Sequence, residues 1–207
     1  MSYLFTSESV SEGHPDKVAD AISDAILDIV MSKEDPTLRC ACETLVTTNM
    51  VTVAGEYKGI LHKEEVESAI RKTIKNIGYE QEGFDWRTVK IYNELHGQSA
   101  DIALGTDNFG AGDQGLMFGY ACNDTKELMP LPISLAHKLA QQLTKVRKSG
   151  ELKYLRPDGK TQVTIEYDKD KAVALNTVVI STQHSAEVDL EKTLAPDLKK
   201  LVIDPII

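Results

Sequence analysis

Residues 5–17 read Phe5-Thr6-Ser7-Glu8-Ser9-Val10-Ser11-Glu12-Gly13-His14-Pro15-Asp16-Lys17. With the preceding Tyr3 and Leu4, the first half is typical of a short strand that ends at Val10, because Gly13-His14-Pro15 then interrupts the chain. From Asp16 to Met31 apolar residues return every three or four positions, which predicts a helix. A strand that leads directly into a helix indicates that the chain mixes both kinds of element.

The same succession continues along the chain. After the first strand and helix we predict a hairpin over Arg39–Thr47 and Met50–Tyr57. A helix over Lys63–Ile77 and a strand over Val89–Leu95 follow it. A second series then follows over Gly115–Ala121, Pro132–Lys148, Gln162–Tyr167, Ala172–Thr182 and Asp189–Ile203. The repetition predicts an α+β fold of repeated β-α-β-β-α-β units, with mixed or antiparallel sheets covered by helices on one face. The second unit lacks its closing strand.

We divide the sequence accordingly into three parts. Residues 1–97 form an amino-terminal α+β unit, and residues 113–207 form a central α+β unit that we expect to be truncated. Residues 98–112 include several small residues and show little periodicity, which predicts a mobile loop at an active site or, alternatively, a plain surface loop.

Composition and the first residues argue against a nucleic-acid-binding, membrane-spanning or secreted protein. The net charge of −9 argues against nucleic acid as a partner, since phosphate binding needs a basic surface. No run of 18 apolar residues predicts a membrane span, and the first residues lack the features of a secretory signal, so we expect a cytoplasmic protein. The three cysteines, Cys40, Cys42 and Cys122, are interpreted as reduced thiols.

The helix start at Pro15 is the first candidate site. Free backbone N–H groups at a helix start favour an anion such as phosphate. His14 could donate to it, Asp16 could hold a bridging cation, and Lys17 could add charge. The alternative is a plain helix cap with a solvated histidine. Three further aspartates at four-residue spacing are interpreted as the solvated face of the helix: Asp20, Asp24 and Asp28.

Other candidates lie further along. Asp113 stands within the glycine-rich stretch 110–115, which is a binding loop or a tight turn. Glu43 and Glu56 are carboxylates on predicted strands; we expect Glu43 to be buried and to need a cation, although ordinary strand-edge charges remain the alternative. Asp158-Gly159-Lys160 has the composition of a turn.

Three of these stretches together resemble the signature sequences of S-adenosylmethionine synthetases, also called methionine adenosyltransferases. They are residues 5–17, Gly110–Tyr120 and Lys160–Thr164. The resemblance runs from Tyr3 to the last residue. It implies a fold of three similar α+β units and a reaction in which the sulfur of L-methionine attacks C5′ of ATP, after which the released tripolyphosphate is hydrolysed.

The resemblance also implies cofactors, partners and residue roles. The cofactors are Mg²⁺ and K⁺, and the assembly is a homodimer or homotetramer with shared active sites. The implied roles are triphosphate contact for His14, Mg²⁺ binding for Asp16, positive charge from Lys17, K⁺ binding for Glu43, methionine contact for Glu56 and Gln98, a place in the substrate site for Asp113, and nucleotide contact for Asp158, Gly159 and Lys160.

The resemblance leaves part of the family pattern unmatched. The third unit, with its glycine-rich loop and basic residues, has no counterpart here, so we expect this chain alone to be inactive. An alternative is a non-catalytic, half-length homologue that binds ligand or a full-length subunit. A magnesium-dependent phosphatase that uses His14 and Asp16 is a further alternative, but it leaves the two later motifs unexplained.

Overall fold

The computed structural model describes residues 1–33, 35, 37–98 and 114–207. The chain separates into two compact units, each considered by itself. Unit 1 contains Met1–His14 and Gly119–Ile207, and unit 2 contains Pro15–Phe118.

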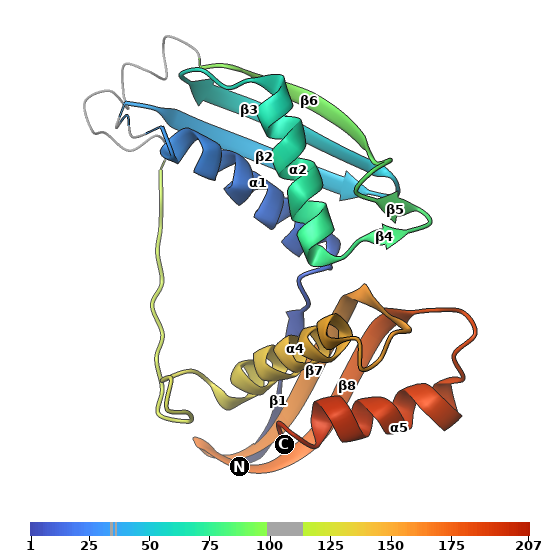
Figure 1. Ribbon diagram of the computed structural model, residues 1–207. Helices are drawn as coiled ribbons and strands as arrows, with labels where there is room; N and C mark the ends of the chain where they lie inside the picture. The colour runs from blue at the N-terminus through green and yellow to red at the C-terminus, as the bar shows by residue number, and fades with distance from the viewer. Residues whose placement is uncertain (34, 36, 99–113) are drawn as a thin grey trace. The chain divides into compact units, whose positions relative to one another are not determined.

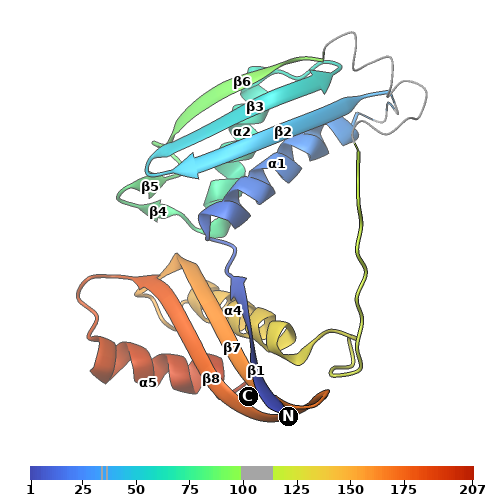
Figure 2. The same cartoon turned by 180° about the vertical axis from the view of Figure 1, so that it is seen from behind.

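Unit 2 is a mixed sheet covered by two helices on one face (Figure 1). Strands β2 and β3 form an antiparallel hairpin, and β6 pairs in parallel with β3. Seen from behind, the other face of this sheet carries no helix (Figure 2). The elements are α1 (Pro15–Met31), β2 (Arg39–Thr47), β3 (Met50–Lys58), α2 (Lys63–Ile77), β4 (Glu80–Gln81), β5 (Phe84–Asp85) and β6 (Lys90–Gly97).

The core of unit 2 follows from the two periodicities of its sequence. Apolar residues at helical spacing on α1 and α2 meet alternate residues of β3, because a helix repeats every 3.6 residues and a strand every two. The side chains that are fully shielded from solvent include Ile22, Ile26, Val51, Val53, Ile70 and Ile74. Burying this apolar surface is the main stabilising contribution within the unit.

Helix α2 has the bounds that the sequence predicts. Glu65 accepts a hydrogen bond from the backbone N–H of His62 at 3.1 Å, which satisfies one donor at the helix start. Gly78 ends the helix at φ 102°, a left-handed conformation that glycine adopts without steric cost.

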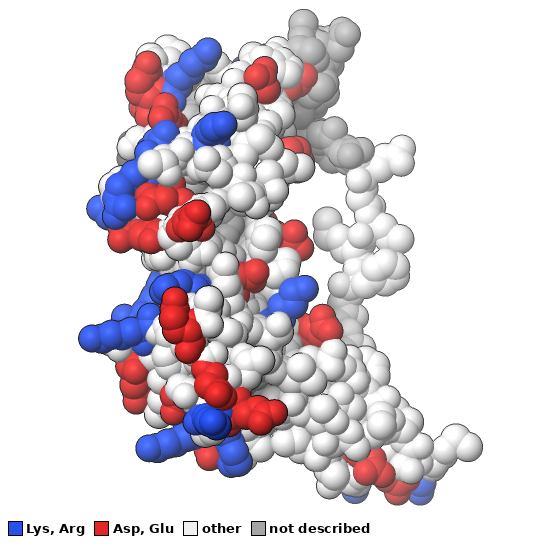
Figure 3. Space-filling view, turned by 90° about the vertical axis from the view of Figure 1, so that its right-hand side faces the viewer, with Lys and Arg blue, Asp and Glu red and all other residues white. Residues whose placement is uncertain are grey.

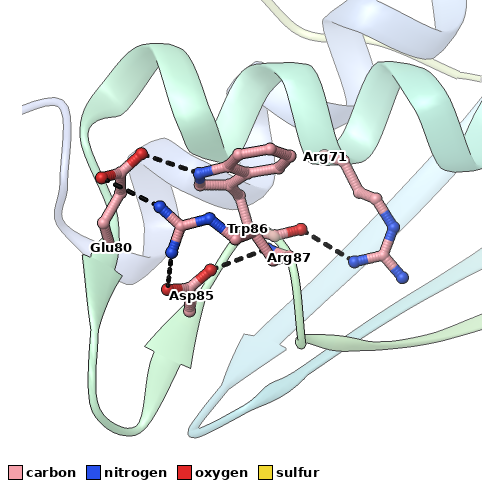
Figure 4. Close-up of polar contacts among 5 residues, drawn as sticks. All are labelled: Arg71, Glu80, Asp85, Trp86 and Arg87. Atoms are coloured by element: carbon pink, nitrogen blue, oxygen red, sulfur yellow. Dashed lines mark hydrogen bonds and ion pairs between the residues drawn. The ribbon is translucent and has the colours of Figure 1, made fainter.

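A polar network closes the short β4–β5 hairpin against α2 (Figure 4). The indole N–H of Trp86 donates to Glu80 at 2.9 Å, and Arg71 on α2 donates to the carbonyl oxygen of Trp86 at 2.8 Å. Arg87 forms ion pairs with Glu80 at 3.2 Å and with Asp85 at 2.8 Å. Trp86 is thereby held on the outer side of α2 as part of unit 2.

Unit 1 is an antiparallel sheet in the order β1-β7-β8. Its strands are β1 (Ser2–Val10), β7 (Leu155–Asp168) and β8 (Lys171–His184). Helix α4 (Leu131–Ser149) packs on this sheet, and a helical segment over η1 (Leu190–Leu194), α5 (Ala195–Leu198) and η2 (Lys199–Ile203) completes the core. The buried side chains of this core include Leu139, Leu143, Val163, Ile165, Leu198 and Val202.

Two tyrosine hydroxyls fasten connecting segments of unit 1 to acidic side chains. Tyr154 donates to Asp197 at 2.8 Å, and Tyr167 donates to Asp124 at 2.8 Å. Burial, followed by the adjacent carboxylate, raises the pKa of both tyrosines well above the usual range. Both hydroxyls therefore remain protonated donors at neutral pH.

Charged side chains of both signs are mixed on the surface. On the face drawn in Figure 3, basic and acidic side chains lie beside one another rather than in separate regions. Pairs such as Arg71–Glu67, at 2.8 Å, are one consequence. Among the helices in the described ranges, none is both long enough and apolar enough to cross a membrane.

The structure confirms the α+β class and the repeated helix–hairpin–helix succession, but it corrects the strands. Residues 1–97 were expected to close one β-α-β-β-α-β set; instead β1 pairs with β7 over nine residues and belongs to unit 1. The predicted strand at Gly115–Ala121 is wrong, since residues 114–121 form no strand. Of the predicted loop, 98–112, all but Gln98 lies outside the described residues.

We predict that Ile70→Ala destabilises unit 2 by about 2–5 kcal/mol, because it leaves a cavity in a fully buried position. Trp86 is the single tryptophan of the chain, so urea unfolding followed by tryptophan fluorescence reports on this unit. The matched control is Ile60→Ala, at a side chain that is 69% exposed. Equal midpoints for the two variants would contradict the assignment of the core.

Candidate nucleotide site

The turn that follows β1 lies against the beginning of β7. The backbone N–H of Ser11 donates to the carbonyl oxygen of Gly159 at 2.8 Å, and the Ser11 hydroxyl donates to the carbonyl oxygen of Pro157 at 2.7 Å. The N–H of His14 donates back to the carbonyl oxygen of Ser11 at 3.1 Å, which closes the turn. His14 and the segment Pro157–Gly159 are thus neighbours in the fold although they are more than 140 positions apart in sequence.

Gly13 permits this close approach. A Cβ atom at this position would overlap the backbone and side chain of Pro157. Only a residue without a side chain lets the turn lie directly on β7. The glycine in the Gly13-His14-Pro15 sequence is therefore required by packing between two distant segments.

Asp158, Gly159 and Lys160 lie inside strand β7, so the prediction of a turn at these residues is wrong. Gly159 and Lys160 pair with residues of β8, and Lys160 also pairs with Val10 of β1. Pairing on both sides of the strand overrides the local turn preference of the sequence. Next to this pairing, one side-chain oxygen of Asp158, Oδ1, is buried and has no hydrogen-bond partner among the described residues.

A buried oxygen without a partner is energetically costly, so the side chain of Asp158 is an acceptor suited to a donor group of a ligand. It stands in the segment that receives Ser11 and Gly13. The backbone geometry and the unpaired carboxylate oxygen together indicate a binding site at the junction of the His14 turn and β7.

Asp16 and Lys17 follow directly at the start of α1, which begins at Pro15 as expected for a proline in a first helical turn. Both side chains are exposed. The interpretation of Asp20, Asp24 and Asp28 as a solvated face is confirmed, since all three are exposed.

Glu43 and Glu56 share the face of the unit 2 sheet that carries no helix. Glu56 lies opposite Ala41, which is on the same side of β2 as Glu43. Glu56 also approaches His96 of β6, with 3.7 Å between Oε1 and Nε2. The expectation that Glu43 is buried is wrong: Cys40 and Cys42 take the core side of β2, and strand alternation then exposes Glu43.

Gln98 follows β6, and its backbone N–H donates to the carbonyl oxygen of Tyr57 at 2.8 Å. Its side-chain oxygen is buried without a partner in the part of the chain that the structure describes. Gln98 and Glu56, which precedes Tyr57, are therefore close in the same sheet. Asp113 lies outside the described residues.

The described residues contain no cluster of three or more histidine, cysteine or acidic side chains placed to hold a metal ion. All three cysteines are free: Cys40 and Cys42 lie half-buried on β2, whereas Cys122 lies outside any strand. Burial raises the pKa of the Cys40 and Cys42 thiols, which makes them poor nucleophiles and poor metal ligands.

Comparison with known proteins identifies the family of the chain. Residues 2–100 match the family description "S-adenosylmethionine synthetase, N-terminal domain", and residues 108–207 match "S-adenosylmethionine synthetase, central domain". The chain belongs to the S-adenosylmethionine synthetase family. It is similar to the S-adenosylmethionine synthase of Nocardia farcinica, with 53% identity over 223 residues that cover 100% of this chain and 55% of the relative. The chain therefore spans about half the length of that synthase.

Within this synthetase-family chain, the predicted residues fall into two groups. Unit 1 brings His14 next to Asp158–Lys160. Unit 2 holds Asp16 and Lys17 at a helix start, and Glu43, Glu56 and Gln98 on its sheet. Sequence reasoning missed Ser11 as the residue that joins the two motifs, because its partners are backbone oxygens that no local pattern reveals.

We predict that Gly13→Ala destabilises unit 1 by about 1–3 kcal/mol, because the added Cβ must push the turn away from Pro157. Urea unfolding followed by circular dichroism measures the loss. Gly119→Ala is the control in the same unit, since a Cβ there meets nothing within 4 Å. If both variants are equally stable, the turn does not lie on β7 as described.

Proposed function

We propose that this chain is part of a methionine adenosyltransferase that converts ATP, L-methionine and water to S-adenosyl-L-methionine, phosphate and diphosphate. The observation that carries the proposal is the contact between the His14 turn and Asp158–Lys160, two motifs of the family that the fold of unit 1 joins. Oδ1 of Asp158, an acceptor without a partner among the described residues, supports a ligand site there.

In the proposed reaction, a lone pair of the methionine sulfur forms the bond to C5′ as the bond from C5′ to the triphosphate oxygen breaks. The bonding electrons leave with tripolyphosphate, which water then cleaves to diphosphate and phosphate. A thioether carries no proton to remove, so the first step needs no general base at sulfur. What it needs is positive charge and hydrogen-bond donors where the leaving group gains charge.

His14 and Lys17 supply these groups in the proposal, and Asp113 lines the substrate site. The carboxylate of Asp158 accepts a hydrogen bond from the nucleotide, and Lys160 adds charge beside the phosphates. Gly159 lies between them and lines the nucleotide site only with its backbone, because a side chain there would meet Leu143 of α4. Asp158 therefore orients ATP, while His14 and Lys17 act on the leaving group.

Mg²⁺ and K⁺ are the cofactors of the proposed site. Mg²⁺ usually binds through one or two carboxylates together with substrate phosphates and water, so a single exposed carboxylate such as Asp16 suits it better than a complete protein cage. Mg²⁺ bound in this way neutralises phosphate charge. Glu43, on the exposed sheet face, is the proposed K⁺ ligand.

Glu56 and Gln98 form the proposed methionine site. Their oxygens suit the ammonium group of an amino acid, and the unpaired oxygen of Gln98 is available for such a donor within the described structure. His96 lies beside Glu56 on this face, with 3.7 Å between Nε2 and Oε1.

The proposed assembly is a homodimer or homotetramer with shared active sites. The sheet faces without helices expose large apolar side chains, among them Leu4, Leu45, Tyr92 and Val179, and a partner subunit would cover them. Action in the cytoplasm, on small-molecule substrates rather than nucleic acid, remains a prediction.

We predict that His14→Ala, introduced into the complete protein, lowers kcat by about 100-fold or more while the KM for ATP changes little, because the lost donor acts on charge that develops in the transition state. Formation of S-adenosylmethionine from ATP, methionine, Mg²⁺ and K⁺ is followed by mass spectrometry. His62→Ala, at the start of α2, is the control for loss of a histidine.

Near-normal turnover of His14→Ala would contradict the catalytic role of His14 and favour the alternative of a plain helix cap with a solvated histidine. Absence of product from the complete wild-type protein would favour a non-catalytic homologue that binds a ligand or a synthase subunit. The 207-residue chain, assayed alongside, is expected to form no product.

A further inference from the structure

Glu12, between Ser11 and Gly13, forms ion pairs with two basic side chains of helix α4, Arg147 and Lys148. Arg147 Nη2 lies 2.5 Å from Glu12 Oε1, and Lys148 Nζ lies 2.9 Å from Oε2. The Arg147 side chain is only 11% exposed and that of Glu12 33% exposed. By contrast, Lys138 of the same helix pairs with Glu127, which precedes the helix, at the longer distance of 3.6 Å, and their side chains are more exposed, at 44% and 56%.

These ion pairs attach the turn before His14 to a second element of unit 1. Ser11 ties one side of the turn to the backbone of β7, and Gly13 packs on Pro157. Glu12 ties the same turn to the last helical turn of α4. The turn is therefore held from two elements at once, and His14 is the second residue after the point of attachment.

The contact of Arg147 is a hydrogen bond between opposite charges, from Nη2 to Oε1 of Glu12. Such a charge-assisted bond is stronger than one between neutral groups, and a lysine at the same position keeps the charge. Shielding from solvent strengthens such a pair relative to an exposed one, because water and salt screen it less. Lys148 Nζ contacts both oxygens of Glu12, Oε1 at 2.8 Å and Oε2 at 2.9 Å, and completes the attachment.

We propose that Arg147 is a positioning residue for the nucleotide site. Through Glu12 it holds the His14 turn against Asp158–Lys160, so that His14 keeps its place relative to the nucleotide without Arg147 touching the substrate. The inference rests on the proposed role of His14, but the attachment itself can be measured without any substrate.

The first experiment measures amide hydrogen exchange in the 207-residue chain and in Arg147→Gln. We expect the amides of Ser11 and His14 to exchange about tenfold faster or more in the variant, because a local opening becomes easier. Core amides of the same unit, such as Leu139 and Val163, are expected to keep their protection. Arg147→Lys should restore most of the protection, and Lys138→Gln is the matched control on α4.

The second experiment introduces the same variants into the complete protein. Since a displacement of about 1 Å can cost about 100-fold in rate, we expect Arg147→Gln to lower kcat by about that factor, with the KM for methionine nearly unchanged. Arg147→Lys should recover a large part of kcat.

Unchanged exchange at Ser11 and His14 would overturn the proposal. Equal acceleration of all amides of unit 1 would also overturn it, since Arg147 would then only stabilise the fold, and so would normal kcat in Arg147→Gln. A wild-type protein that makes no S-adenosylmethionine would refute the proposed function alone, because the exchange result still decides whether Arg147 holds the turn.

Discussion

The antiparallel pairing of β1 with β7 is the constraint on which the candidate site depends. It runs without a shift from Ser2 opposite Asp168 to Val10 opposite Lys160. Continuing this register by one residue brings Ser11 to Gly159, and two further residues bring Gly13 to Pro157, where the contacts are found. A slip by one residue would turn every side chain of β1 to the other face and would separate the His14 turn from Asp158.

Side chains along both strands specify this register. On the face without helices, the hydroxyls of Thr6 and Thr164 are hydrogen-bonded at 2.9 Å, and the side-chain amide of Gln162 donates to the carboxylate of Glu8 at 2.7 Å. On the helix side, Ser9 is hydrogen-bonded to His137 of α4 at 2.7 Å. Such cross-strand pairs each contribute only a fraction of a kcal/mol to about 1 kcal/mol, so their combination rather than any one of them selects the register.

The sequence predicts the parts of the fold that depend on neighbouring residues. Helix α2 has its predicted bounds because capping and periodicity are local signals, and β2 and β3 lie over the predicted hairpin for the same reason. The partner of β1 could not be predicted, because β7 is about 150 positions away and many strands of similar composition compete for it. The turn predicted at Asp158-Gly159-Lys160 is wrong because strand pairing on both sides outweighs the turn preference of these residues.

For the candidate site, sequence similarity named His14 and Asp158–Lys160, but only the fold explains how they meet. The exposure of Glu43 could have been predicted from the sequence. Cys40 and Cys42 alternate with it along the strand, and cysteine side chains favour the core. The attachment of Glu12 to Arg147 had no local signal, because a glutamate and an arginine 135 positions apart look like ordinary surface charges.

The proposed nucleotide site joins the His14 turn to the start of β7. It is tested by titrating the isotopically labelled protein with MgATP while the amide resonances of His14 and Lys160 are followed. We expect both resonances to shift along the same saturation curve, and Gly13→Ala to weaken both responses by the same factor. A response confined to one of the two segments, or two different saturation curves, would contradict it.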